Sequence, residues 1–251
     1  MNIHYLESSE EAGRRAAEEA AQYLQEAIRR SGGARIAVAT GASQYAFLDH
    51  LTKSPDIDWS KITMFHLDEY IGLPPDHHGS LRRYLRERVV DKVHPGRCMF
   101  IDGNASEPQM ECRRLGEIMA EGPCDAAFIG IGENGHVAFN DPPADFQVDQ
   151  AYIIVNLDDV CRRQQVGEGW FTALSDVPSR AITMSIRQIL RARKIFCVVP
   201  ELRKADAVRA CVEEEISPLR PASILRSHAN IELYLDPFSA SKLSRQGAVE
   251  R

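Results

Sequence analysis

Short apolar runs alternate with helical segments along nearly the whole chain, and this alternation limits the fold more than any other feature. Strands are predicted at residues 35–40, 61–67, 126–131, 152–157, 181–185, 194–199 and 231–235. Helices are predicted at residues 8–30, 44–51, 80–90, 108–121, 186–191 and 202–213. Strands that alternate with helices form βαβ units. We therefore expect a doubly wound α/β fold of modified Rossmann type, with a mostly parallel sheet and helices on both faces.

The chain shows no internal repeat, linker or low-complexity segment, so residues 1–251 are predicted to form a single domain. Its core is expected at about residues 8–236, followed by a polar C-terminal tail. The six cysteines contain no Cys-x-x-Cys pair and are interpreted as free thiols.

Composition excludes several classes of function. The formal net charge of −6 argues against nucleic acid as the main partner, because binding a phosphate backbone needs a basic face. No apolar run approaches the ~20 residues that span a bilayer, so no membrane partner is expected. The first residues lack the pattern of a signal peptide, which favours a cytoplasmic protein.

The stretch from Asp125 to Pro143 is the strongest candidate for a site. A short apolar strand is followed at once by glycines and by polar residues, namely Gly130, Gly132, Asn134, Gly135, His136, Asn140 and Asp141. Ligands of open α/β sheets bind at the carboxyl ends of the strands. His136 and Asp141 are five residues apart, so a loop can bring the carboxylate to the imidazole and fix its tautomer. The alternative is a structural histidine that bonds to the glycine turn.

Three further loops follow predicted strands and converge on the same edge. Gly41-Ala42-Ser43 is suited to bind a phosphate through backbone N–H groups, although this stretch taken alone favours an ordinary helix cap at Ser43. Asp68-Glu69 provides a candidate general base, or solvated acids, or a cap for the next helix. Lys204, in the first turn of a predicted helix, is explained by an anionic ligand or by simple solvation.

No metal site is expected. His77 and His78 are adjacent, which is not the i,i+4 spacing of a helical metal site, and no acidic partner lies at ligand spacing.

Two long motifs in these loops resemble glucosamine-6-phosphate deaminases, within the wider group of sugar-phosphate isomerases and 6-phosphogluconolactonases. They are Leu-Asp-Glu-Tyr-Ile-Gly-Leu-Pro at residues 67–74 and Gly-Ile-Gly-Glu-Asn-Gly-His-Val-Ala-Phe-Asn-Asp-Pro at residues 130–142. The resemblance implies that Asp68 is the base that moves a proton between C2 and C1 of the sugar phosphate, and that His136 opens the ring. It also implies a substrate-binding set made of Gly41, Ala42, Ser43, Glu69, Gly135 and Lys204.

The chain departs from the best-studied members of this family at two positions beside the histidine. Asn134 stands where they carry an aspartate, and Asp141 stands where they carry a glutamate. We expect Asn134 to accept a hydrogen bond from the imidazole without stabilising its charge, which predicts an altered pH dependence or a related amino-sugar substrate.

The family's phosphate-binding arginine has no secure match, and Arg162 and Arg163 are the nearest candidates. Residues 142–161 contain no lysine or arginine. We therefore expect no allosteric site of the kind some members build there for an acetylated sugar phosphate.

The predicted activity is that of a glucosamine-6-phosphate deaminase, a hydrolase with isomerase character that needs no cofactor. It would convert glucosamine 6-phosphate and water into fructose 6-phosphate and ammonia. The enzymatic alternatives are a galactosamine-6-phosphate deaminase and a 6-phosphogluconolactonase. A non-catalytic sugar-phosphate sensor is the alternative from another class, but the first sheet strand, expected at Arg35, leaves room for only one preceding helix. The partner is a small sugar phosphate, and both a monomer and a homo-oligomer agree with the sequence.

Overall fold

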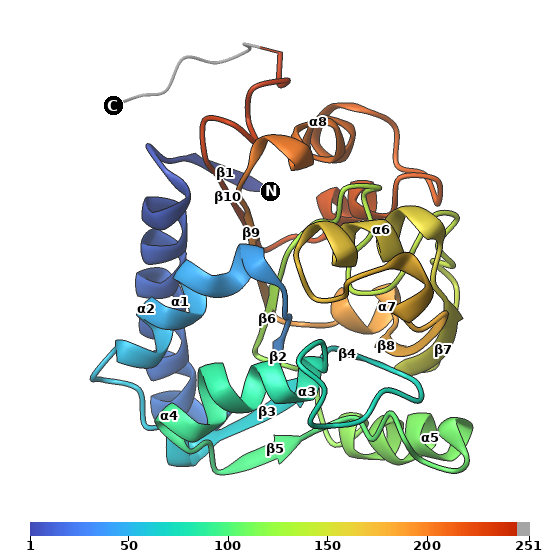
Figure 1. Cartoon of the computed structure of the whole chain (residues 1–251). Coiled ribbons are helices and arrows are strands. Elements are labelled where there is room, and N and C mark those ends of the chain that lie inside the picture. The colour runs from blue at the N-terminus through green and yellow to red at the C-terminus, as the bar shows by residue number, and fades with distance from the viewer. Residues whose placement is uncertain (245–251) are drawn as a thin grey trace.

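A seven-stranded sheet forms the centre of the computed structural model, which describes residues 1–244 (Figure 1). Its strands lie in the order β1 (Asn2–Tyr5), β10 (Ile231–Leu235), β9 (Lys194–Val199), β6 (Ala126–Ile129), β2 (Ala34–Val38), β3 (Ile62–His66) and β5 (Arg97–Met99). All neighbouring pairs are parallel. After β2 the chain adds β3 and β5 on one side of the sheet, and after β6 it adds β9 and β10 on the other side. The strand order therefore reverses between β2 and β6, where open α/β sheets bind ligands.

A smaller antiparallel sheet packs beside the main one and contains β4 (Asp68–Tyr70), β8 (Arg180–Met184) and β7 (Tyr152–Asn156). The sequence predicted β7 and β8 as strands but gave residues 68–70 to a loop. The structure corrects this, because the Met184 N–H donates to the Leu67 carbonyl at 2.8 Å and Asp68 then pairs with Thr183. The strand that carries Asp68 is thereby fixed by a second sheet.

Helices cover both faces of the main sheet, as predicted. The cluster on one face contains side chains of α1 (Ser9–Ser31), α2 (Tyr45–Lys53) and α3 (Leu81–Leu85), and α3 continues through a π-helical turn at Arg86–Val90 into α4 (Asp91–Val93). The cluster on the other face contains side chains of α5 (Pro108–Met119), α7 (Ile186–Ile189) and α8 (Ala205–Glu213). α6 (Asp159–Gly167) packs on the smaller sheet.

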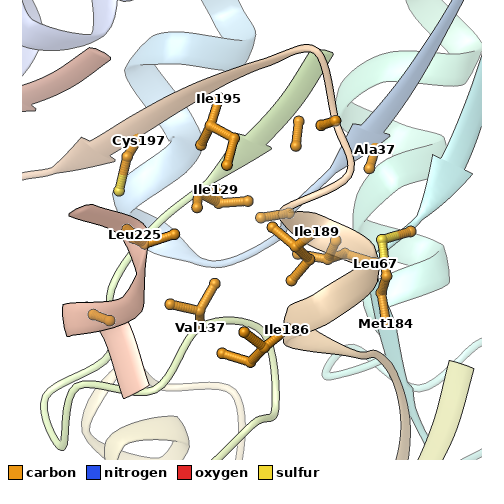
Figure 2. Close-up of a cluster of buried hydrophobic side chains, with 14 of the residues drawn as sticks. Ala37, Leu67, Ile129, Val137, Met184, Ile186, Ile189, Ile195, Cys197 and Leu225 are labelled. Carbon is orange, nitrogen blue, oxygen red and sulfur yellow. The ribbon is translucent and has the colours of Figure 1, made fainter. Parts of the chain in front are cut away.

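The strands are buried on both faces, which explains their continuous apolar sequences. Ile36 and Val38 of β2 belong to one cluster, whereas Ala37 between them belongs to the other. Figure 2 shows part of the second cluster, in which Val137 lies close to Ile186 and Leu225. Val137 directly follows the candidate histidine, so its burial anchors that loop in the core.

The first helix begins and ends where the sequence predicted. The Ser8 hydroxyl accepts a hydrogen bond from the Glu11 N–H at the N-terminus, and Gly32 closes the C-terminus with φ +77°.

The edge strands β1 and β5 were not predicted, and the expectation that the first sheet strand begins at Arg35 is wrong. β1 precedes it and pairs with β10. Both edge strands are short and partly exposed, so neither has a continuous apolar run in its sequence.

The structure also describes the cysteines and the apolar character of the helices. The six cysteines are free, and all except Cys98 are buried. No helix in residues 1–244 has both the length and the apolar character needed to cross a membrane.

Candidate active site

A cavity opens at the carboxyl ends of β2 and β6, where the strand order reverses. Both halves of the fold contribute to it, because the loop after β2, the loop after β6, the strand β4, helix α6 and the start of α8 all reach its wall. The residues that line it are Ala39, Thr40, Gly41, Ser43, Asp68, Leu81, Gly130, Ile131, Gly132, His136, Ala138, Phe139, Gln164, Gln165, Glu168 and Lys204. Five of the predicted functional residues thus share one cavity, namely Gly41, Ser43, Asp68, His136 and Lys204.

Asp68 is a buried carboxylate with no compensating charge. Its Oδ1 atom has no hydrogen-bond partner within the described residues. Burial, reinforced by repulsion from Glu69, raises the pKa of Asp68 to about 8. A carboxylate with so high a pKa is a much stronger base than an exposed aspartate, which suits it to remove a proton from carbon.

Glu69 does not line the cavity, in contrast to the expectation that it binds substrate. Its carboxylate accepts hydrogen bonds from the N–H groups of Tyr70 (2.8 Å), Leu81 (3.2 Å) and Arg82 (2.7 Å) and from the Ser80 hydroxyl (3.0 Å). Glu69 therefore caps the start of α3, which is the alternative that the sequence left open.

The imidazole of His136 lies directly over Gly132. A Cβ atom on Gly132 would approach Cε1 of the imidazole to 2.2 Å, so only glycine leaves room for the ring. The Gly132 N–H donates to the His136 carbonyl at 2.9 Å. Asn140 holds the far side of the loop by donating to the carbonyls of Val137 and Met184. The glycines and the buried loop residues therefore fix the position of the histidine.

Asp141 lies beside His136, with Oδ1 3.1 Å from Nδ1 of the imidazole. Burial by itself raises the pKa of Asp141, but the nearby imidazole of His136 and the hydrogen bonds from the Asn134 amide and the Asp158 N–H outweigh it and lower the pKa below its ordinary value. Asp141 is therefore an anion near neutral pH and can stabilise a protonated imidazole.

Asn134 has a different role from the one expected. Its carbonyl oxygen accepts the backbone N–H of His136 at 3.0 Å rather than an imidazole N–H. Its amide nitrogen donates to Asp141 and to Asp158, both at 3.0 Å. Asn134 thus bridges two carboxylates behind the histidine, a position in which an aspartate would add a third negative charge.

The cavity is also lined by the predicted phosphate-binding residues Gly41, Ser43 and Lys204. Gly41 has φ +105°, which favours glycine, and its carbonyl accepts the Tyr84 hydroxyl at 2.8 Å. Lys204 is 2% exposed, and burial lowers its pKa. A lysine buried in this way is not the solvated lysine of the alternative interpretation. Ala42 and Gly135, which were also predicted, do not line the cavity.

Three lining residues, Gln164, Gln165 and Glu168, were not predicted. They lie on α6 and just after it, in a segment for which no helix or strand was predicted. Buried glutamine and glutamate have the same appearance in a sequence as exposed ones, so no signal distinguishes them.

The two arginines proposed for phosphate binding lie elsewhere. The Arg162 guanidinium donates to the carbonyls of Leu174 and Val177, and Arg163 pairs with Asp159 at the surface. Neither lines the cavity.

One group of potential metal ligands adjoins the site. His136, Asp141 and Cys161 place donor atoms within 4.8 Å of one another. Asp141 already interacts with His136, Asn134 and the Asp158 N–H, so its oxygens are committed to hydrogen bonds that position the histidine. We assign no metal to this group.

Comparisons with known proteins agree on one family. A family model described as glucosamine-6-phosphate isomerases/6-phosphogluconolactonase matches residues 7–234. A glucosamine-6-phosphate deaminase of Exiguobacterium sibiricum is 36% identical over 220 residues, which are 88% of this chain and 85% of that protein. A glucosamine-6-phosphate deaminase of Bacillus cytotoxicus is 32% identical over 251 residues, covering 100% of this chain and 92% of that protein.

Solved structures give the same result. A structure described as a monomeric glucosamine-6-phosphate deaminase superimposes with a TM-score of 0.88 at 30% identity, covering 96% of this chain and 99% of the other. A 6-phosphogluconolactonase of Trypanosoma brucei shares the fold, with a TM-score of 0.80 at 17% identity over 97% of this chain and 98% of the other.

Proposed function

The chain belongs to the family of glucosamine-6-phosphate isomerases and 6-phosphogluconolactonases, and we propose that it acts as a glucosamine-6-phosphate deaminase. The reaction converts glucosamine 6-phosphate and water into fructose 6-phosphate and ammonia. The observation that carries the proposal is that one cavity contains a buried base, Asp68, a carboxylate-oriented histidine, His136, and a buried cation, Lys204.

In this proposal His136 opens the sugar ring. The imidazole accepts the proton of the C1 hydroxyl and delivers a proton to the ring oxygen, so that the C1 aldehyde forms as the ring bond breaks. Asp141 stabilises the imidazolium that exists between the two transfers, and Asn134 keeps Asp141 and the loop in place.

Asp68 then moves a proton between adjacent carbons. Its carboxylate removes the proton from C2, which gives an enediol-type intermediate, and the same group returns the proton to C1. Water adds to the C2 imine that results, and ammonia leaves. Binding of the phosphate by Lys204, Ser43 and the backbone at Gly41 fixes the position of the open-chain sugar, so one carboxylate can transfer the proton between both carbons.

A direct assay tests the proposal. Purified protein is mixed with glucosamine 6-phosphate, and ammonia and fructose 6-phosphate are measured, with the two products expected in equal amounts. Asp68→Asn is expected to abolish turnover while it still binds the substrate. Full activity of that variant would remove Asp68 from its role.

Galactosamine 6-phosphate and 6-phosphogluconolactone are assayed in parallel. Turnover of either one, without turnover of glucosamine 6-phosphate, would overturn the substrate assignment but leave the fold and family unchanged.

The proposal also covers the cellular location, the substrate class and the oligomeric state of the enzyme. We expect a cytoplasmic enzyme that acts on a small sugar phosphate. Its similarity to a structure described as monomeric favours a monomer, which light scattering coupled to size exclusion would test.

A further inference from the structure

The phosphate end of the cavity contains a buried carboxylate, Glu168, whose side chain is 4% exposed. Its oxygens accept hydrogen bonds from the Gln164 amide (2.8 Å) and the Trp170 indole (3.2 Å). Oε1 also lies 3.7 Å from Nη2 of Arg203 and 3.9 Å from Nζ of Lys204. Within residues 1–244, Glu168 is the one carboxylate that lies within 4 Å of the Lys204 ammonium.

A carboxylate in this place conflicts with phosphate binding. A phosphate group bound by Lys204 and the Gly41 loop would share that cation with Glu168, and a Cβ atom on Gly41 would lie only 3.8 Å from Oε2 of the same glutamate. Two anions so close together, in a site with little solvent, repel each other strongly. Either the phosphate binds weakly, or Glu168 moves away.

The backbone around Glu168 allows such a movement. The residue stands between Gly167 and Gly169, and a Cβ atom on either glycine would meet no other atom within 4 Å. Gly169 has φ +83°, a conformation that glycine adopts without strain. Glu168 therefore follows the end of α6 with no side chain on either neighbour to block rotation of its own.

We propose that Glu168 is a stand-in anion, which neutralises Lys204 in the free protein and is displaced when the phosphate group of the substrate takes over this cation. The inference rests on the proposed function, because it assumes a phosphorylated ligand at this end. Arg203 contacts Glu133, Glu168 and Glu201 but does not line the cavity, so Lys204 is the cation for which Glu168 and the phosphate compete. Glu168 thereby sets how strongly the enzyme selects for a phosphorylated sugar.

Binding to three variants tests the displacement. Isothermal titration calorimetry measures the Kd of glucitol 6-phosphate, an open-chain probe that cannot react, for the wild type, Glu168→Gln and Glu201→Gln. Glu201 is the matched control, because it pairs with the same Arg203 at 2.6 Å but does not line the cavity. We expect Glu168→Gln to bind about tenfold more tightly, and Glu201→Gln to change the Kd by less than about twofold.

Steady-state kinetics gives a second readout. Removing a competitor of the phosphate lowers KM, whereas kcat stays within about twofold because the hydrogen bonds of the Glu168 side chain go to Gln164 and Trp170 and not to Asp68 or His136. In a Lys204→Met background the effect of Glu168→Gln on binding should largely disappear, since the shared cation is absent. Glu168→Ala, which also removes the bulk of the side chain, should bind at least as tightly as Glu168→Gln.

Several outcomes would overturn the proposal. An unchanged or weaker Kd in Glu168→Gln, with thermal unfolding that shows a folded protein, makes Glu168 a structural residue or a direct ligand. An equal gain in Glu201→Gln makes the effect one of general charge. If the wild type turns over glucosamine 6-phosphate and Glu168→Gln is unchanged, only this inference fails. If the wild type binds no sugar phosphate, the proposed function fails and this inference with it.

Trp170 reports the displacement directly, because its indole N–H donates to Glu168. The chain has two tryptophans, so Trp59→Phe leaves Trp170 as the single fluorophore. Glucitol 6-phosphate should shift the emission of this variant, and a spectrum that stays constant at saturation would contradict the displacement.

Discussion

Some functional residues of this protein lie in surroundings that lower the stability of the folded chain. Asp68 is the clearest case, because a carboxylate buried without a counter-charge favours its protonated form in the folded chain. The same burial makes it a strong base when it is ionised. Asp68→Asn should therefore inactivate the enzyme and stabilise it at the same time.

The stabilisation by Asp68→Asn should depend on pH. Below about pH 4 the carboxyl is neutral in both folded and unfolded chains, so the two proteins should unfold with similar free energies. Between pH 4 and the folded pKa of about 8, the unfolded chain ionises freely and the folded chain does not, so the wild type loses stability as pH rises. We expect Asp68→Asn to be more stable by about 2–5 kcal/mol at pH 8, as measured by urea unfolding. A difference that is the same at pH 4 and pH 8 would contradict the burial argument.

The pH dependence of catalysis should follow from the same carboxylate. A base with a pKa of about 8 is mostly protonated at pH 6, so kcat/KM should fall about tenfold for each pH unit below that pKa. The pH–rate profile measures this directly. A profile that is flat between pH 6 and pH 8 would show that ionisation of Asp68 does not limit the reaction of the free enzyme.

Asn134 is expected to be required for stability as an uncharged hydrogen-bond donor to two carboxylates. Its amide donates to both Asp141 and Asp158, so Asn134→Asp would remove two hydrogen-bond donors and place a third carboxylate beside two others. We expect a loss of about 2 kcal/mol in the free energy of unfolding at pH 7. The loss should shrink as pH falls and the new carboxyl is protonated. Asn134→Ala, which removes the donors without adding charge, is the control, and a smaller loss in Asn134→Asp than in this control would contradict the argument.

At the scale of elements, the site depends on how strands end and loops begin. The loop after β6 turns under the histidine at Gly132, and α3 begins where Glu69 caps it. These two features concern the position of functional groups rather than their chemistry. They predict opposite consequences for activity and stability.

Gly132→Ala should reduce activity with little effect on the fold. The new methyl group would meet the imidazole of His136 at 2.2 Å, and the ring must move away from its place beside Asp141. We expect kcat to fall about 100-fold, the effect of a misplaced catalytic group. Gly122→Ala is the matched control, because a Cβ there meets nothing within 4 Å. Equal activity in both variants would show that the ring is free to move.

Glu69→Gln should have the reverse effect. The carboxylate accepts four hydrogen bonds, three of them from the start of α3, and an amide nitrogen cannot accept the bonds at one of its two positions. We expect a loss of about 2 kcal/mol in the free energy of unfolding, with KM unchanged because the side chain does not line the cavity. A large increase in KM without a loss of stability would return Glu69 to the substrate-binding set.

Strands and helices could be predicted where long apolar runs or caps mark them, as in α1 and β9. The short strands β1, β4 and β5 could not. Their positions depend on pairing with strands far away in the chain, as when β4 pairs with β8 across more than a hundred residues. Likewise, the sequence placed Asp68, His136 and Lys204 at strand ends, but the burial of Gln165 and Glu168 follows from the packing of α6 and has no local signal.

At the scale of the whole molecule, the cavity lies where the two sheets meet. Its wall takes residues from β4 of the smaller sheet and from the loops that follow β2 and β6 of the main sheet. A bound sugar phosphate therefore contacts both sheets at once. Its binding free energy should add to the stability of the molecule as a unit.

Thermal unfolding should show this coupling. At a concentration 100 times its Kd, glucitol 6-phosphate should stabilise the protein by about 2.7 kcal/mol, which corresponds to an increase in Tm of about 5–10 °C for a chain of this size. Calorimetry measures the increase, and the transition should remain single. A Tm that rises for one of two separate transitions would show that the sheets unfold independently.

The buried cysteines can report which regions of the folded protein open to solvent. Five of the six thiols are buried, among them those on α5, α6, α8 and β9, so we expect an alkylating reagent to reach only the partly buried Cys98 in the folded state. Mass spectrometry after a short pulse of the reagent would then count how many regions have opened. Molecules with one label and molecules with six mark a single cooperative unit, whereas intermediate masses would identify, thiol by thiol, the part that opens first.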